Sequence, residues 1–226
     1  MNWNLTPAEA IQLQKELKEK IDIRPFPGPI QKIAGADISY NKNDDTIYAG
    51  IIVLDYETME PICRSTIIDK MRFPYIPGLL SFREIPSLYA AWEALEEKPD
   101  ILAMDGHGIN HFRRLGVATH FGLISGQACI GIAKNHLTGT YEEPGPKRGS
   151  FSNIIDQGEK IGYVLRSRDQ VKPVWVSPGH RVSMEQSLEI ALHCSRGLRI
   201  PEPTRQAHLM VNELRRGEIE AGVKSF

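Results

Sequence analysis

The sequence predicts an α/β protein built on one mixed β-sheet with flanking helices. The first observation is that three β-rich segments, separated by short polar turns, lie within residues 33–71, which is typical of an antiparallel meander. The second is that residues 82–134 alternate between helical and short apolar strand patterns, which favours parallel strands. Hydrophobic residues make up 41% and charged residues 24% of the 226 residues, as in ordinary globular proteins.

A helix is expected at the amino-terminal side of the meander. Thr6-Pro7-Ala8-Glu9 has the residues of a capping box with proline at the first helical position, and it predicts a helix to about Ile21. The proline-rich residues 24–29 then end this helix. The three strands of the meander are expected over residues 33–40, 46–56 and 62–71.

Two helix-strand pairs are expected after the meander. They comprise a helix over residues 82–95, a strand over 101–105, a small-residue helix over 115–124 and a buried strand over 129–134. A three-stranded antiparallel meander followed by α-β-α-β is the order of a ribonuclease H-like mixed sheet. We therefore predict this fold class, with helices flanking the sheet.

The rest of the chain adds smaller elements. Residues 136–160 are rich in Gly, Pro, Lys and Glu and indicate a surface loop. Further strands are expected at 163–167 and 174–176, and helices over 183–194 and 204–215. No linker or repeat interrupts this order, which indicates a single domain over residues 1–226.

The lack of a recognisable targeting signal and the pattern of cysteines predict a reduced, cytoplasmic environment. No uncharged apolar run is long enough to span a membrane, and Met1–Pro7 lacks the charged and apolar regions of a signal peptide. Cys63, Cys129 and Cys194 are odd in number and far apart, so we expect free thiols and no disulfide framework.

Charge is distributed unevenly although the formal net charge is only −1. Residues 1–112 carry 11 Lys/Arg and 17 Asp/Glu, whereas residues 113–226 carry 16 and 11. An acidic half that holds cations and a basic half that holds phosphates would suit a phosphodiester substrate. The alternative is a chance asymmetry of solvated surfaces.

Three carboxylates occupy positions that suit a metal site. Asp37 lies within an apolar strand, Asp105 ends another, and Glu84 lies at the start of the helix after the meander. If the strand over 101–105 pairs with the strand over 33–40, Asp37 and Asp105 become neighbours, and oxygen-only ligands suit Mg²⁺ or Mn²⁺. Alternatively, Asp37 faces solvent, Asp105 serves a turn and Glu84 complements the helix amino terminus.

Two basic side chains fit the same chemistry. Lys134 closes the next strand and could neutralise phosphate charge, or could simply reach solvent. His208, one turn after Arg205 on the last helix, could orient water or contact phosphate, or could be an ordinary surface residue. The glycines around His107 and His111 argue against a helical zinc site.

A stiff aromatic loop precedes Glu84. Tyr75 stands between Pro74 and Pro77, next to Ile76, and proline restricts the backbone of such a loop. A rigid ring can stack where an extruded base used to be, which predicts a wedge for nucleic acid. The alternative is an aromatic anchor that packs the loop onto the core.

These segments together resemble the endonuclease V family. The resemblance extends from about Ala34 to the last helix and rests on residues 34–40, 74–84, 105–111 with Arg113 and Gly116, and 131–134. It implies a ribonuclease H-like fold and Mg²⁺, or Mn²⁺ as a substitute, held by Asp37, Asp105 and Glu84. It also implies that Lys134 and His208 belong to the active site and that Tyr75 is the wedge.

The resemblance further implies a substrate and a reaction. Family members recognise deoxyinosine, the deamination product of adenine, in DNA and cut the second phosphodiester bond on its 3′ side, leaving 3′-hydroxyl and 5′-phosphate ends. Some act on inosine in RNA, and no obligate protein partner is implied. The positions that match the family's base pocket are Gly78, Leu80, Gly106, His111, Gly116 and Leu137.

The sequence departs from the family pattern at three positions, and two rival functions are compatible with it. His107, Asn110 and Phe112 are not the residues expected at these positions, which bears on fine base preference. One rival is a ribonuclease H-like nuclease that acts mainly on inosine-containing RNA. The other is a non-catalytic inosine-binding module, which would have no need of convergent acids beside a lysine.

Overall fold

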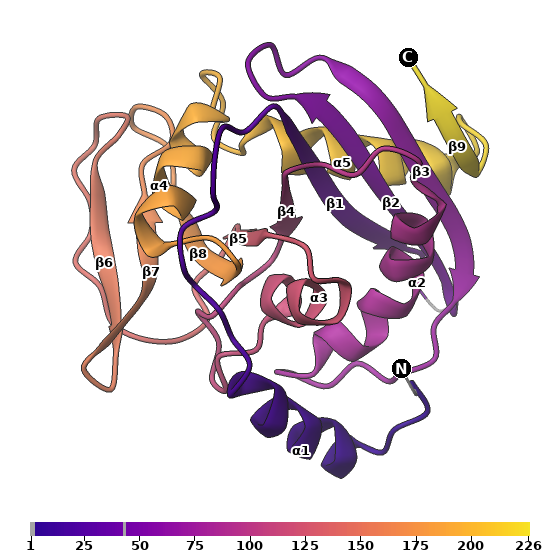
Figure 1. Cartoon of the computed structure of the whole chain (residues 1–226), viewed down its shortest axis with the longest axis horizontal. Helices are drawn as coiled ribbons and strands as arrows, with labels where there is room; N and C mark the ends of the chain where they lie inside the picture. Colours follow the sequence, from indigo (N-terminus) through magenta and orange to yellow (C-terminus); the bar gives the residue numbers. More distant parts are fainter. Residues whose placement is uncertain (1–2, 43) are drawn as a thin grey trace.

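The computed structural model describes residues 3–42 and 44–226 (Figure 1). The amino-terminal half comprises helix α1 (Pro7–Lys18), strands β1 (Lys32–Tyr40), β2 (Thr46–Asp55) and β3 (Pro61–Lys70), and helix α2 (Leu80–Ala94). The central part comprises strand β4 (Ile101–Asp105), helix α3 (Val117–Ser125) and strand β5 (Cys129–Ala133). The remainder comprises strands β6 (Phe151–Asp156), β7 (Glu159–Leu165) and β8 (Val174–His180), helices α4 (Met184–His193) and α5 (Glu202–Arg216), and strand β9 (Gly222–Ser225).

The described residues form one nine-stranded mixed sheet in the order β6-β7-β8-β5-β4-β1-β2-β3-β9. Strands β1, β2 and β3 form an antiparallel meander, and β4 and β5 run parallel to β1. Strands β8, β7 and β6 extend the sheet antiparallel beyond β5, and β9 extends it beyond β3. The predicted fold class, a mixed sheet with a meander and two parallel strands, is confirmed.

Helices cover both faces of this sheet, and each face has its own core. In β4, Ile101 and Ala103 face the core shared with α4 and α5, whereas Leu102 and Met104 face the core shared with α2 and α3. Such a strand is buried on both sides and has no polar face, which explains its uninterrupted apolar sequence. The centre of the sheet is therefore the rigid part of the molecule.

Local signals in the sequence start the first and fourth helices. Thr6 and Glu9 form the predicted capping box of α1, and Ser183 and Gln186 form that of α4. Each pair satisfies backbone N–H groups that have no partner within the helix.

Two elements differ from the sequence-based prediction. Residues 136–160, expected to be loop, contain β6 and the start of β7, joined by a two-residue turn in which Gln157 and Gly158 have φ values of 54° and 81°. Strand β6 lies at the sheet edge and buries only Ile154 fully, so its apolar signal is weak. Strand β9 was not predicted because its four residues are all exposed.

Neither cysteine cross-links nor membrane spans are found in the described part of the chain. Cys63, Cys129 and Cys194 are free and buried, as expected. None of the helices described here combines the length and the apolar character needed to cross a bilayer.

The buried His120 of α3 makes stability depend on acidity. Its Nδ1 lies 2.9 Å from the Ser81 hydroxyl, and burial lowers the pKa of the ring to about 3, against an ordinary value of about 6.5. The unfolded chain therefore binds this proton more readily, and the free energy of unfolding should fall as pH decreases from 6.5 towards 3. We expect His120→Gln to make this decrease shallower in urea unfolding measured from pH 7 to pH 4; an unchanged slope would contradict the assignment.

Candidate active site

Parallel pairing of β1 and β4 brings two carboxylates together at the centre of the sheet. Ala36 pairs with Met104, so the next residues, Asp37 and Asp105, lie side by side (Figure 1 shows the two strands). Both side chains are largely buried, with 11% and 14% of their surface exposed. Two buried carboxylates on adjacent strands repel each other unless positive charge is placed between or beside them.

Helix α5 adds a histidine to this pair. His208 Nδ1 lies 2.8 Å from Asp37 Oδ2, and Asn212 Nδ2 lies 3.3 Å from His208 Nε2. Ser39 in turn donates a hydrogen bond of 3.1 Å to Asn212 Oδ1, so both ring nitrogens of His208 have a partner. This contact between the helix and β1 holds the imidazole in one orientation.

Close packing of α5 on β1 depends on Gly35. A Cβ atom at this position would lie 1.8 Å from the backbone oxygen of Pro203, so any other residue would push the start of α5 away from the strand. Gly35 is two residues before Asp37 and Pro203 is five residues before His208. The glycine thus sets the distance between the two functional side chains.

Glu84 lies in the first turns of helix α2, which packs on the sheet, and it is almost fully buried. Burial, together with the charges of Asp37 and Asp105, raises the pKa of its carboxyl to about 8. Asp37, Asp105 and His208 each offer one ligand atom within 4.8 Å of the others, and among the described residues Glu84 is not in that group. Glu84 is therefore near enough to Asp37 and Asp105 to feel their charges, but its carboxylate lies outside the group of ligand atoms within 4.8 Å of one another.

Lys134, the residue after β5, provides the positive charge beside the pair. Its Nζ forms an ion pair with Asp105 Oδ2. Burial and the Asp37 charge raise the pKa of Asp105, and the Lys134 ammonium opposes this shift. Arg199 donates a hydrogen bond of 2.8 Å to the backbone oxygen of Lys134 and so supports the position of that residue.

A cavity of about 270 Å³ opens directly beside Glu84 and Asp105. The six positions expected to form a base pocket all line it, as do three residues of the predicted wedge loop, Tyr75, Ile76 and Pro77; Pro74 does not. Its lining also includes residues that sequence reasoning did not place there. These are Ser81, Glu84, Asp105, His107, Phe112, Leu115 and Val117.

The tyrosine of the wedge loop points out of the core. Tyr75 is 63% exposed, at the mouth of the cavity, which excludes the alternative of an anchor packed into the interior. The loop itself is fixed from below, because Arg113 Nη2 and Gln14 Nε2 donate hydrogen bonds of 2.8 Å and 3.0 Å to the Gly78 carbonyl oxygen. Gln14 was missed by sequence reasoning, since a glutamine on an amphipathic helix carries no signal that it is buried.

His111 is a neutral wall of the cavity at physiological pH. Burial and, to a smaller extent, the Arg113 charge lower its pKa to about 4. Its Nδ1 accepts a hydrogen bond of 3.2 Å from the Arg113 backbone N–H, so the ring proton is on Nε2. The His111 side chain therefore presents to the cavity an uncharged ring with one N–H donor.

Asp37 within β1 and Asp105 at the end of β4 lie side by side next to an open cavity, an arrangement typical of nucleases of the ribonuclease H-like type. Comparison with known proteins identifies the group: the endonuclease V family model matches residues 12–209. Endonuclease V of Myxococcus xanthus is 47% identical over 220 residues, which cover 97% of this chain and 94% of that protein. The chain belongs to the endonuclease V family, and the sequence-based resemblance is confirmed.

Solved structures agree with this assignment. The crystal structure of endonuclease V from Streptomyces avermitilis matches with a TM-score of 0.91 and 37% identity over 96% of both chains. Endonuclease V of Ciona intestinalis, solved in complex with a 24mer DNA containing an inosine followed by a ribo-adenosine, matches with a TM-score of 0.82 and 28% identity over 94% of this chain and 98% of that chain. Membership of a nuclease family also sets aside the non-catalytic binding module.

The raised pKa of Glu84 predicts a pH-dependent effect of Glu84→Gln. The folded protein holds the Glu84 proton up to about pH 8, whereas the unfolded chain loses it near pH 4.5, so wild-type stability falls as pH rises between these values. In the presence of a chelator, we expect the unfolding temperature of Glu84→Gln to gain on the wild type from pH 5 to pH 8 and then to stay constant relative to it. Parallel curves across this range would show that the pKa of Glu84 is not raised in the folded protein.

Proposed function

We propose that this nuclease recognises deoxyinosine in DNA and hydrolyses the second phosphodiester bond on its 3′ side, leaving 3′-hydroxyl and 5′-phosphate ends. The observation that carries the proposal is the shared boundary of cavity and acid cluster: Glu84 and Asp105 belong to both. A cavity near the lower limit of ligand pockets, roughly 300 Å³, suits a single flat base. The relative from Ciona intestinalis binds inosine-containing DNA, which supports the same substrate class here.

The donor set fits a hard divalent cation. Burial and the charges of neighbouring carboxylates raise the pKa of Glu84 and of Asp105, and Lys134 provides one positive charge beside the cluster. We propose that Asp37, Asp105 and Glu84 hold Mg²⁺, with Mn²⁺ able to substitute, because carboxylate oxygens are the ligands these ions prefer. When bound, the ion would supply Lewis-acid stabilisation of the phosphodiester charge.

The chain's own side chains would bind and orient the reacting groups. Lys134 lies beside Asp105 with an ammonium group available for phosphate oxygens. His208 donates from Nδ1 to Asp37, and its Nε2, which faces the donor Asn212 Nδ2, can accept a hydrogen bond from the attacking water. The extruded base would enter the cavity, where backbone groups near Gly78 and Gly106 can read its edge.

Loss of either central carboxylate should abolish cutting. We expect Asp37→Asn and Asp105→Asn to lower the cleavage rate by more than about 100-fold, since even indirect partners of metal ligands contribute about 10–100-fold. The measurement is nicking of end-labelled DNA with a single inosine, in Mg²⁺ and in chelator. Asp45→Asn, which removes an exposed carboxylate paired with Lys70, serves as the matched control and should cut normally.

The outcomes of this assay separate the rival substrates. A single Mg²⁺-dependent nick one nucleotide beyond the inosine would support the proposal. Failure of the folded wild-type protein to nick this DNA, with cutting of inosine-containing RNA, would favour the RNA-directed nuclease. Full activity of Asp105→Asn would overturn the proposed metal site.

Tyr75 should contribute to binding of duplex DNA. Stacking of an aromatic side chain on a base contributes about 1–3 kcal/mol, so Tyr75→Ala should weaken Kd for inosine-containing duplex by about 5- to 150-fold. The measurement uses the Asp105→Asn background in chelator, with Tyr75→Phe as a control that keeps the ring. A smaller loss is expected for single-stranded DNA, where no gap in a base stack needs filling; equal affinity of Tyr75→Ala and wild type for duplex would show that the ring is not a wedge.

A further inference from the structure

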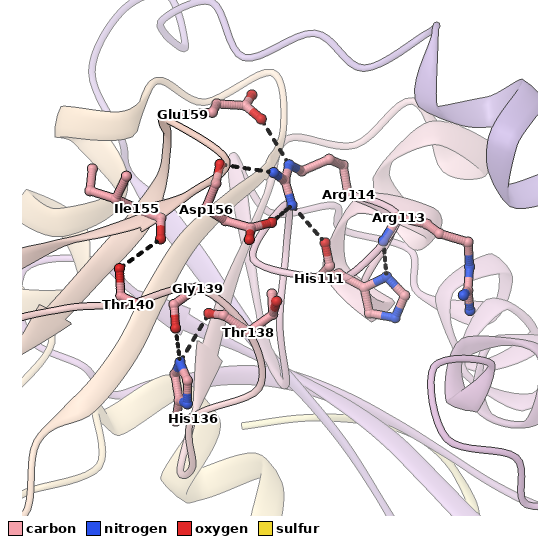
Figure 2. A network of polar contacts seen from close by, with 10 residues as sticks. All are labelled: His111, Arg113, Arg114, His136, Thr138, Gly139, Thr140, Ile155, Asp156 and Glu159. Carbon is pink, nitrogen blue, oxygen red and sulfur yellow. Dashed lines mark hydrogen bonds and ion pairs between the residues drawn. The ribbon is translucent and has the colours of Figure 1, made fainter.

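Arg114 is a buried arginine in a backbone conformation that costs energy. Its φ is 60°, in the left-handed region, and only 7% of its surface is exposed. A non-glycine residue keeps such a conformation only where its surroundings fix it. Figure 2 shows what fixes it: the guanidinium points away from Arg113 and into the turn between β6 and β7.

Two carboxylates of that turn hold the guanidinium. Arg114 Nη1 lies 2.7 Å from Asp156 Oδ2, and Nε lies 2.9 Å from Glu159 Oε2. The Asp156 side chain is 20% exposed and that of Glu159 59%, so Asp156 is the better shielded partner. Removing its charge would leave the buried guanidinium with the more exposed Glu159 as its remaining carboxylate partner, which is unfavourable.

The same guanidinium holds one wall of the base cavity. Arg114 Nη1 donates a hydrogen bond of 3.0 Å to the His111 carbonyl oxygen, and the Arg114 backbone N–H donates one of 2.9 Å to the same oxygen. His111 lines the cavity, as do Leu115 and Gly116 directly after Arg114. The position of this wall thus depends on the hairpin turn.

A second segment that lines the cavity is held by the same hairpin. Thr140 and Ile155 exchange two backbone hydrogen bonds of 2.8 Å and 2.9 Å, one residue before Asp156. His136 Nε2 lies 3.0 Å from the carbonyl oxygens of both Thr138 and Gly139 and closes this short loop (Figure 2). Leu137, inside the loop, lines the cavity.

We propose that the β6–β7 hairpin is a clasp that sets the spacing of the His111 and Leu137 walls, with Arg114 as the positioning residue, and that discrimination of hypoxanthine from adenine depends on it. None of the residues 151–165 lines the cavity, so the hairpin acts only through the segments it holds. A displacement of about 1 Å costs up to roughly 100-fold where groups must be aligned. The specificity part of the clasp rests on the function proposed above.

The first test is Asp156→Asn in the full-length protein. We expect the ratio of kcat/KM for inosine-containing DNA to kcat/KM for the matched adenine DNA to fall by about 10-fold. The fall should come from a change in KM, while kcat stays nearly the same. Asp156→Glu, which retains the carboxylate, should restore the ratio. Arg114→Lys, which keeps the charge but loses the forked geometry, should behave like Asp156→Asn, and the double variant should be no worse than either single variant.

The matched control breaks a similar ion pair at the other end of the same hairpin, away from its turn. Arg166 and Glu143 lie 2.6 Å apart, and the arginine side chain is 11% exposed, close to the 9% of Arg114. Both Arg166 and Glu143 lie outside the cavity lining. We expect Glu143→Gln to destabilise the fold without changing the inosine-to-adenine ratio. An equal fall in this control would overturn the clasp, since any loss of stability would then explain the result.

A second readout separates the clasp from the proposed substrate. Amide hydrogen exchange without nucleic acid should increase at residues 111–117 and 137–140 in Asp156→Asn and not in Glu143→Gln. Unchanged exchange together with an unchanged ratio would overturn the clasp. If the wild type itself shows no preference for inosine over adenine, the proposed function and the specificity role fail, while the exchange pattern still decides whether the hairpin holds the two walls.

Discussion

Parallel pairing of β1 with β4 is the constraint on which the rest of the site depends. It places Asp37 beside Asp105 in the centre of a sheet that is covered on both faces, where neither carboxylate can turn away into solvent. Like charges in such a position are unfavourable, and the surroundings contain the groups that offset them: Lys134 from the next strand and His208 from α5. Burial and the charges of Asp37 and Asp105 together raise the pKa of Glu84, and a site that disfavours carboxylate charge in this way is suited to a cation.

Each of these groups arrives on a different element, so their convergence is a property of the whole fold. The sheet supplies Asp37, Asp105 and Lys134, α2 supplies Glu84 and α5 supplies His208. Gly35 allows α5 to approach β1 closely enough for the 2.8 Å contact between His208 and Asp37. Side chains carried by packed helices and strands keep their positions better than side chains on loops, which suits alignment of a phosphodiester for attack.

The central half of the fold could be predicted because its sequence is nearly free of conflicting signals. Strands such as Ile101–Asp105 are apolar throughout, and the acids at their ends stand out against that background. Strands β6 and β9 could not be predicted, since edge strands bury few side chains and carry mixed polarity. The partners Arg114 and Asp156 were equally invisible, because residues 42 positions apart meet only through tertiary structure.

The consecutive arginines Arg113 and Arg114 illustrate how one loop can be held from two sides. Arg113 turns towards α1 and the wedge loop, where it contacts Gln14 and Gly78, whereas Arg114 turns towards the β6–β7 hairpin (Figure 2). Adjacent side chains diverge in this way because the left-handed backbone of Arg114 reverses the direction of the chain. Arg113 and Arg114 thereby connect the tyrosine loop, the cavity wall and the hairpin through direct contacts, and these contacts set the arrangement of the three segments around the cavity.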